Sequence, residues 1–431
     1  MGEGPEKGEE LPFPNIGLDM DAPSTRVRGR RHAAGGSLLA IALTLTTALT
    51  LTFVAPAGAT GGRGHHPPPP PPPSGPVVIA TGLDNPRQLS FDGDDLYVAE
   101  AGLGGDQACM PGPEGGEVCL GQSAAVTKID RWGQRRVLSG LPSIADTDGS
   151  AAIGAADVAV DHGRYAVLVG LGADPAVREQ EGAPEFADQL GTLLTGTFRG
   201  RHHSWKTTSG KAAHPSYGYG PRIAADVSAY EAEANPDGAQ VDSNPVGLWS
   251  GRYGWVVADA GGNDVLHVSW WGHTSTLGVF PTRLVPPPPF LPPGDIDMDA
   301  VPTSAVPGPD GALYVSQLTG FPFPAGGSNI WRLVPGQEPT IYATGLTNVT
   351  DLGWYRGQLY AVQLADGGLL AVPEDEPPVG SLVKVGTGGQ HTAVASGLVA
   401  PYGLALSGGN AYVTTCSVCP GAGEVVRVPL G

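Results

Sequence analysis

The sequence predicts an all-β fold, a six-bladed β-propeller closed by pairing of its N-terminal strand with its C-terminal blade. Glycine and proline account for 66 and 43 of the 431 residues, and both residues favour turns over helix interiors. Residues 80–100 and 343–363 align without a gap and share eight identities, which fall on apolar and turn positions. Identities of this kind indicate a repeated scaffold rather than a repeated active site.

Six repeated units each contain three recognisable strands, and a glycine-containing turn separates the first strand of each unit from the second. The first strands are NPRQL (85–89), ADVAV (156–160), NPVGL (244–248), VPTSAV (301–306), NVTDL (348–352) and APYGL (400–404). The second strands are DLYVAE, YAVLVG, GWVVAD, ALYVSQ, QLYAVQ and NAYVTT, and the third are AVTKID, GTLLTG, DVLHVS, NIWRLV, SLVKV and EVVRV. Glycine accepts the positive φ of tight hairpins, and alternating apolar residues are typical of half-buried strands. Units of about four strands repeated in this way predict a propeller.

The two ends of the folded region predict how the ring closes. The chain ends just after EVVRVPLG, a third strand, and the folded part begins with VVIATGL, which has the pattern of a fourth. We therefore expect residues 77–81 to pair with the C-terminal segment, because this pairing covers two strand edges that would otherwise be exposed. The propeller is expected to span residues 77–431.

The N-terminal region has the features of an export signal. Four arginines precede an apolar run, Ser37–Val54, and the small residues Ala57-Gly58-Ala59 follow it; the arginines are Arg26, Arg28, Arg30 and Arg31. This order predicts a signal over residues 1–59, with Met20 as a possible true start, and an extracellular protein. An uncleaved membrane anchor is the alternative, since about 18 apolar residues can span a bilayer. Residues 60–76, with seven successive prolines, predict an extended linker.

The charge balance restricts the class of partner. The chain has 42 acidic and 24 basic residues and a net charge of −18. An acidic surface repels phosphate backbones, so nucleic acid is not expected as a partner. After removal of the signal we expect a monomer without stable membrane insertion, which binds an extracellular small molecule, glycan or protein.

Four cysteines, Cys109, Cys119, Cys416 and Cys419, follow the second strands of the first and sixth units, which adjoin in a closed ring. Disulfides are the expected state in an oxidising compartment. We expect a Cys109–Cys119 bond, which leaves Cys416 and Cys419 as a local pair or as a cross-link to the first loop. A zinc site with four thiolates is the alternative.

Several segments resemble one protein family. They include LYVAEAGLGGDQACMPGPEGGEVC, AYEAEANPDGAQVDSNPVGL, VVADAGGNDVLHV, PTSAVPGPDGALYVSQLTGFPFP and CSVCPGAGEVVRV. Together these segments resemble the ScyD/ScyE family of exported propellers, and six-bladed NHL-like and SMP30-like propellers more distantly. The resemblance covers residues 77–431 and implies a six-bladed propeller outside the cytoplasm. It implies no particular reaction, because the family has no established one. Three features depart from the pattern: Ala156 where a histidine is expected, Cys419 where an aromatic residue is expected, and an insertion between GTLLTG and PRIAADVSAYEAE that contains His202, His203, Trp205 and His214.

Polar residues recur in two matched registers that we expect at one mouth of the propeller. Glu100, Asp259, Gln317 and Gln363 end second strands, and Asp157 and Asp351 start first strands. Their oxygens suit Ca²⁺ or another divalent cation. In a lactonase-like hydrolase such an ion would polarise a carbonyl and activate water. The candidate metal ligands or general base of this hydrolase are Glu100, Asp157, Asp259 and Asp351. The structural alternative is that these side chains bind the loops between blades.

Two stiff apolar loops are candidate contact surfaces. LTGFPFP places Phe321 and Phe323 between prolines, and Pro286–Phe290 forms a second such loop. Rigid exposed aromatic residues bind a partner with little loss of side-chain entropy, whereas the same residues packed inward would cover the blades. The function expected from the sequence is therefore a non-catalytic or accessory binding module. The alternative is the metal-dependent hydrolase.

Overall fold

The computed structural model describes residues 75–431, apart from residues 112–115, 181, 199–219, 374–375 and 387. The predicted export signal, residues 1–59, and residues 60–74 of the linker lie outside the described part. Among the described residues, no helix has both the length and the apolar character needed to cross a membrane.

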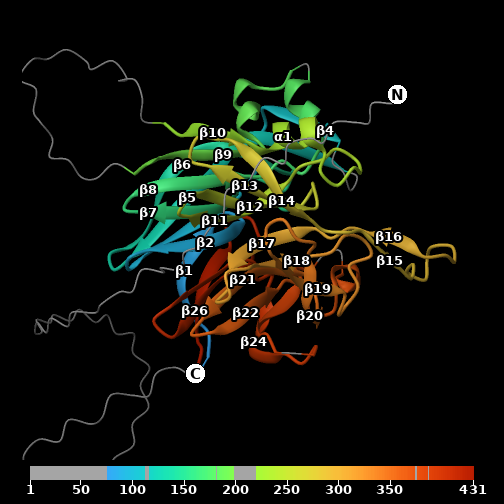
Figure 1. The fold of residues 1–431 in the computed structure, drawn as a ribbon. Helices are drawn as coiled ribbons and strands as arrows, with labels where there is room; N and C mark the ends of the chain where they lie inside the picture. The colour runs from blue at the N-terminus through green and yellow to red at the C-terminus, as the bar shows by residue number, and fades with distance from the viewer. Residues whose placement is uncertain (1–74, 112–115, 181, 199–219, 374–375, 387) are drawn as a thin grey trace, which may run out of the picture. The chain divides into compact units, whose positions relative to one another are not determined.

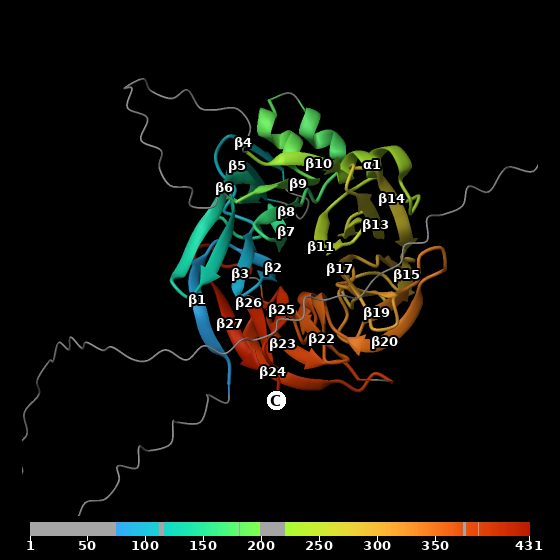
Figure 2. The ribbon, with the colours of Figure 1, turned by 60° about the vertical axis from the view of Figure 1, so that its left-hand side comes forward.

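Six antiparallel sheets form the blades, with the strand order of each running outward from the innermost strand (Figures 1 and 2). Blades 1 and 2 consist of β2 (Pro86–Asp92), β3 (Asp95–Glu100), β5 (Glu117–Asp130) and β6 (Gly133–Asp146), then β7 (Ala155–Asp161), β8 (Arg164–Val169), β9 (Thr192–Thr197) and β10 (Arg222–Asp226). Blades 3 and 4 consist of β11 (Pro245–Gly251), β12 (Gly254–Asp259), β13 (Asp264–Ser269) and β14 (Thr274–Val279), then β17 (Pro302–Pro307), β18 (Leu313–Gln317), β19 (Ser328–Leu333) and β20 (Thr340–Leu346). Blades 5 and 6 consist of β21 (Val349–Tyr355), β22 (Gln358–Gln363), β23 (Val379–Lys384) and β24 (Thr392–Val399), then β25 (Leu404–Ser407), β26 (Asn410–Thr415), β27 (Gly423–Pro429) and β1 (Val77–Leu83). The predicted six-bladed propeller is confirmed.

The first and last strands of the propeller close the ring. β1 pairs antiparallel with β27, from Val77 opposite Arg427 to Leu83 opposite Gly423. The predicted closure is therefore confirmed, and β1 extends two residues beyond the expected end. Ala80 and Leu83 are buried, so the closing strand contributes to the core as well as to the hydrogen-bond ladder.

Six apolar clusters explain why the sequence repeats. One cluster lies between each pair of neighbouring blades, including the cluster between blades 6 and 1 that contains Leu83, Val98 and Val425. The innermost strands contact one another in sequence around the ring, and β25 contacts β2. Each blade must therefore bury both faces against its neighbours, which selects the same apolar and turn positions in every unit.

The long connections share one face of the propeller, because second strands end and first strands begin on the same side of every blade. This face, here called the loop face, carries β4 (Ala108–Pro111), η1 (Pro175–Glu179), η2 (Glu185–Gln189), α1 (Val227–Ala234), the hairpin of β15 (Arg283–Val285) and β16 (Ile296–Met298), and η3 (Leu369–Ala371). The sequence did not predict α1 or this hairpin. α1 begins where the side chain of Asp226 accepts a hydrogen bond from the Ala229 amide, and it ends at Asn235 in a left-handed conformation, as is common at helix ends.

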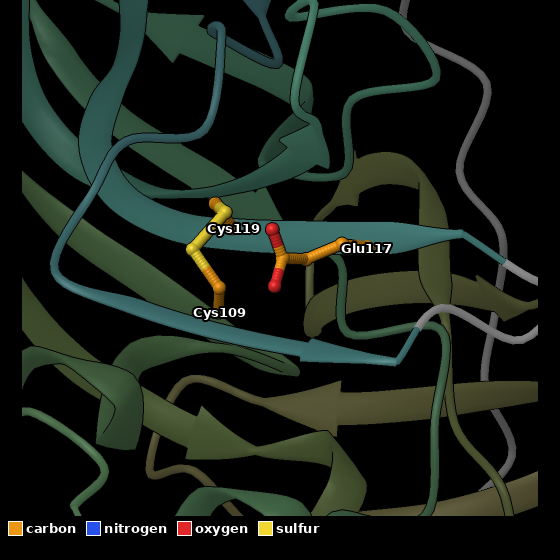
Figure 3. Close-up of side chains that lie close together, drawn as sticks. All are labelled: Cys109, Glu117 and Cys119. Carbon is orange, nitrogen blue, oxygen red and sulfur yellow. A yellow bond between two sulfur atoms is a disulfide. The ribbon is translucent and has the colours of Figure 1, made fainter.

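Both cysteine pairs are disulfides on the loop face. Cys109 and Cys119 join β4 to β5, and Cys416 and Cys419 close a short turn after β26. The expected Cys109–Cys119 bond is confirmed, and Cys416 and Cys419 form the local pair rather than a cross-link. The carboxylate of Glu117 lies beside the first disulfide (Figure 3). Since all four sulfurs are in disulfides, they offer no thiolates to zinc.

Candidate functional site

Each blade places one residue at an equivalent position near the start of its innermost strand. In blade order these residues are Gln88, Asp157, Gly247, Ser304, Asp351 and Gly403. In blades 1 to 5 the strand register shifts here, and such bulges redirect side chains. The order polar, aspartate, glycine thus occurs twice around the ring.

Asp157 and Asp351 each connect their own blade to the following one. Asp157 accepts hydrogen bonds from the amide of Val158 at 2.6 Å and from the amide of Leu248 in the next blade at 2.7 Å. Asp351 repeats this arrangement with Leu352 and, in the next blade, with Leu404, both at 2.7 Å. The predicted matched register of the two aspartates is therefore a pair of equivalent links between blades.

The two carboxyl groups are buried near each other, which disfavours a charge on both. Burial raises the pKa of Asp351 to about 7. Burial and the neighbouring carboxylate of Asp351 raise the pKa of Asp157 well above its ordinary value. Near neutral pH, this pair of groups therefore retains a proton that the unfolded chain would release.

The raised pKa of Asp351 predicts that the stability of the protein depends on pH. Because its folded pKa of about 7 exceeds the ordinary value of 3.8, its contribution is complete at low pH and is lost as pH rises from about 4 to about 7. The slope is about 1.4 kcal/mol per pH unit for one retained proton. We expect Asp351→Asn to reduce the loss of unfolding free energy between pH 5 and pH 7.5, measured by urea denaturation. An unchanged difference between the two pH values would contradict this assignment.

The centre of the ring is crossed by a side chain from blade 1. The amide of Gln88 donates to the carbonyl of Thr303 in blade 4 at 2.9 Å and to that of Val246 in blade 3 at 3.2 Å. Its neighbour Arg87 is half-buried, with its guanidinium over the Tyr402 ring. The Gln88 hydrogen bonds join blade 1 to blades 3 and 4 across the axis, whereas the Arg87 contact joins the neighbouring blades 1 and 6. At this level the side chains hold the ring together.

The carboxylate of Glu100, at the end of β3, is also fully occupied by hydrogen bonds. The carboxylate accepts from the amide of Asp84 at 2.8 Å, from the hydroxyl of Thr127 at 2.5 Å, and from Arg136 at 2.7 and 3.2 Å. It is fully buried. The side chain therefore fixes the connection between blades 6 and 1.

The other second-strand ends bind connections in the same way. Asp259 accepts from the Ser243 hydroxyl and from the amide of Asn244, both at 2.6 Å. Gln363 accepts from the amide of Thr347 at 2.8 Å, and Gln317 accepts from Asn329 and Trp331 in its own blade. These hydrogen bonds to loops and neighbouring strands correspond to the alternative given for these positions from the sequence, in which the side chains have a structural role.

A metal-dependent hydrolase would need three or more oxygens meeting at one point with an open coordination position. Among the described residues, the one group of three His, Cys, Asp or Glu side chains with ligand atoms within 4.8 Å of one another is Cys109, Glu117 and Cys119. The four candidate ligands at the axis do not form such a group. Glu100 and Asp259 hold separate loops, whereas Asp157 and Asp351 are near neighbours.

Three phenylalanines on the loop face form an aromatic cluster, defined here as Phe290, Phe321 and Phe323. The ring centroids of Phe290 and Phe321 are 6.5 Å apart, and those of Phe321 and Phe323 are 6.3 Å apart. Phe290 is 68% exposed and Phe321 is 39% exposed. The two loops identified in the sequence therefore meet, and their rings are not buried against the blades.

The guanidinium of Arg283 fixes one of these loops to the other. It donates to the carbonyl of Gly327, which joins the β15–β16 hairpin to the loop between β18 and β19. The hairpin projects beyond the blades in Figure 1. Asp295, Asp297 and Asp299 are exposed on it, so an acidic border accompanies the aromatic cluster.

One group of acidic residues at blade 3 was not recognised in the sequence. It comprises Glu231, Asp237, Asp242, Asp259 and Asp264. Residues 230–264 include six acidic residues and one basic residue, Arg252. This local excess of acidic residues could have indicated the group. The fold was needed to bring α1 to the turn between β12 and β13.

Comparison with known proteins supports no further assignment beyond the fold. No family model matches the chain, and no curated protein matches it. Among solved structures, a Bacteroides thetaiotaomicron VPI-5482 protein of unknown function is 9% identical, with a TM-score of 0.46 over 82% of this chain and 75% of that one. Virginiamycin B lyase from Staphylococcus aureus is 9% identical, with a TM-score of 0.39 over 83% and 98% of the two chains. A luciferin-regenerating enzyme is 10% identical, with a TM-score of 0.43 over 82% and 95%.

The strand pairing defines the class of this protein, which is a six-bladed β-propeller closed between its first and last strands. The similar structures have unlike or unknown activities, and none of these activities follows for this chain.

Proposed function

We propose that this protein is an exported, non-catalytic binding module of the ScyD/ScyE kind, which recognises another extracellular protein through its loop face. The observation that carries the proposal is the aromatic cluster, in which Phe290 and Phe321 are exposed and Phe323 is half-buried. Two disulfides among the described residues support an oxidising environment outside the cytoplasm.

The chemistry of the surface favours a protein as the partner. Large aromatic side chains are enriched where protein partners exclude water. The cluster is held by ring contacts and by the Arg283 anchor to Gly327, so binding orders little additional chain. The border of Asp295, Asp297 and Asp299 complements lysine or arginine side chains. A partner with an apolar patch beside basic residues fits both features.

Site-specific crosslinking tests the proposal. We expect benzoylphenylalanine at position 290 to give a light-dependent adduct with one extracellular protein from the native culture. Phe321→Ser should reduce its yield about tenfold, as expected for loss of an interface anchor worth about 1.4 kcal/mol or more. The same photoreactive residue at Trp271, which is 96% exposed in the β13–β14 turn of the opposite face, is the matched control.

The three outcomes are distinct. An adduct from position 290 alone supports the proposal. Equal adducts from both positions, or none from position 290, would contradict it. An adduct between two copies of this chain would identify the aromatic cluster as a homodimer interface instead.

A further inference from the structure

The turn between β12 and β13 brings acidic residues of blade 3 against α1. In the antiparallel pair of these strands, Asp259 and Asp264 are directly opposite each other. Like charges at opposite positions destabilise a sheet. α1 follows β10 and leads to β11, so it lies between blades 2 and 3 (Figure 2). Its Glu231 is within the electrostatic reach of both aspartates.

Several oxygens in this region accept no hydrogen bond. Both carboxylate oxygens of Asp264 are buried without a partner, and so are Oε1 of Glu231 and Oδ1 of Asn235. Asp264 is only 1% exposed and Glu231 only 2%. Buried acceptors without donors are costly to a fold, so four such atoms from residues 231, 235 and 264 indicate a missing positive partner.

Asp259 does not supply that partner, because its carboxylate is itself an acceptor and is already satisfied by other donors. It accepts from the Ser243 hydroxyl and from the amides of Asn244, Gly261 and Gly262. Its charge acts instead on its neighbours. The charged groups that act on Glu231 and Asp264 are all acidic; they are Asp237, Asp242, Asp259 and, for Asp264, Glu231.

Gly262 lies directly beside the carboxylates of Glu231 and Asp264. A Cβ atom at this position would be 3.0 Å from Oε2 of Glu231 and 3.6 Å from Oδ1 of Asp264. Any larger residue would therefore place atoms against both groups. The glycine, the unpartnered oxygens and the acidic character of every described group that acts on them are mutually consistent features of an ion site.

We propose that Asp264 and Glu231 bind a divalent cation, Ca²⁺, at the junction of α1 and the β12–β13 turn. Two carboxylates balance its charge, and Ca²⁺ accepts the irregular oxygen shell that carboxylates, an amide oxygen such as that of Asn235, main-chain carbonyls and water provide. Mg²⁺ is a poorer fit, because it requires near-octahedral geometry. Asp237, Asp242 and Asp259 raise the local negative potential. The proposal stands independently of the partner proposed for the aromatic cluster.

Protons are the competing way to neutralise these groups. Burial and the charges of Asp259, Asp237 and Asp242 raise the pKa of Glu231 to about 7. Burial and neighbouring acidic groups likewise raise the pKa of Asp264 well above its ordinary value. A shared proton would satisfy the pair without metal, so the experiment must separate the two cases.

The test uses the purified full chain after removal of metal with a chelator, CaCl₂ alone as the probe, and calorimetry and thermal unfolding at pH 7.5. We expect about one Ca²⁺ per chain and a rise in Tm. Asp264→Asn should bind at least about a hundredfold more weakly, since it removes a charged ligand. Without Ca²⁺ the same variant should have a higher Tm than the wild type at pH 7.5, because the amide is neutral without taking up a proton.

The order of the two Tm values should therefore reverse on addition of Ca²⁺. Gly262→Ala should also weaken binding, and Asp94→Asn, at an exposed carboxylate in the turn between β2 and β3, should not. If Gly262→Ala fails to fold, the Asp264→Asn comparison decides. Absence of Ca²⁺ binding, or binding unaffected by Asp264→Asn, would overturn the proposal and favour the shared proton.

Discussion

A chain that lacks residues 1–83, and with them β1, is expected to lose most of its stability. β1 supplies the fourth strand of blade 6 and pairs with β27 along its whole length. Without it, the edge of β27 is exposed and the cluster between blades 6 and 1 loses Ala80 and Leu83. The loss should approach the whole free energy of unfolding, which is about 5 to 15 kcal/mol for folded domains. Urea denaturation followed by circular dichroism measures it.

Removal of residues 1–75 is the matched control, since it leaves β1 intact. This chain should unfold at the same urea concentration as the full chain. A synthetic peptide of residues 76–84 added to the shorter chain should restore part of the lost stability, because it replaces the missing strand without a covalent link. Equal stability of the two truncated chains would show that the closing strand is dispensable.

The sequence was sufficient for the fold because every blade solves the same packing problem. Neighbouring blades bury apolar clusters of the same kind, so the pattern of apolar residues and glycine turns recurs in all six units. The closure of the ring could be predicted because the first and last strands of the propeller each had an edge without a partner. The Cys109–Cys119 disulfide followed from the short loop that joins two adjacent strands.

The chemistry of the loop face could not be predicted in the same way. In the sequence, Glu100 belongs to the register at the ends of second strands and Asp157 to the register at the starts of first strands. Both registers were equally good candidates for a site at the axis. Their directions depend on strand pairing: Asp157 follows a bulge in β7 and reaches the next blade, whereas Glu100 faces Arg136 within its own blade. Glu231 and Asp264 are 33 positions apart in the sequence, and only the packing of α1 brings them together.

The structure of β10–α1–β11 shows why the acidic region was missed. Residues 227–234 form a helix of eight residues in a chain whose repeating pattern is entirely of strands. A short helix in a connection has too few residues for a clear helical period. Its Asp226 cap and Asn235 end are local signals, but the same residues are common in turns. Tertiary packing therefore determines which of its side chains are buried.

Arg136→Ala is expected to destabilise the protein by about 3 kcal/mol, because it leaves the buried carboxylate of Glu100 without its cation. The guanidinium bonds Glu100 through two nitrogens and also pairs with Asp84, and these interactions raise its own pKa. The estimate is at the low end for a buried pair, since the side chain of Arg136 is partly exposed. Equilibrium urea denaturation at pH 7 measures the change.

The neighbouring Arg135 offers a matched control for the loss of Arg136. Its side chain is more exposed and pairs with Asp130, which keeps Lys128 as a second cation, so Arg135→Ala should cost less than about 1 kcal/mol. Glu100→Gln in the Arg136→Ala background should recover stability relative to Arg136→Ala alone, because it removes the unpaired charge. If both arginine variants have the same small effect, Glu100 does not depend on Arg136, and the amide of Asp84 and the hydroxyl of Thr127 are sufficient partners for this carboxylate.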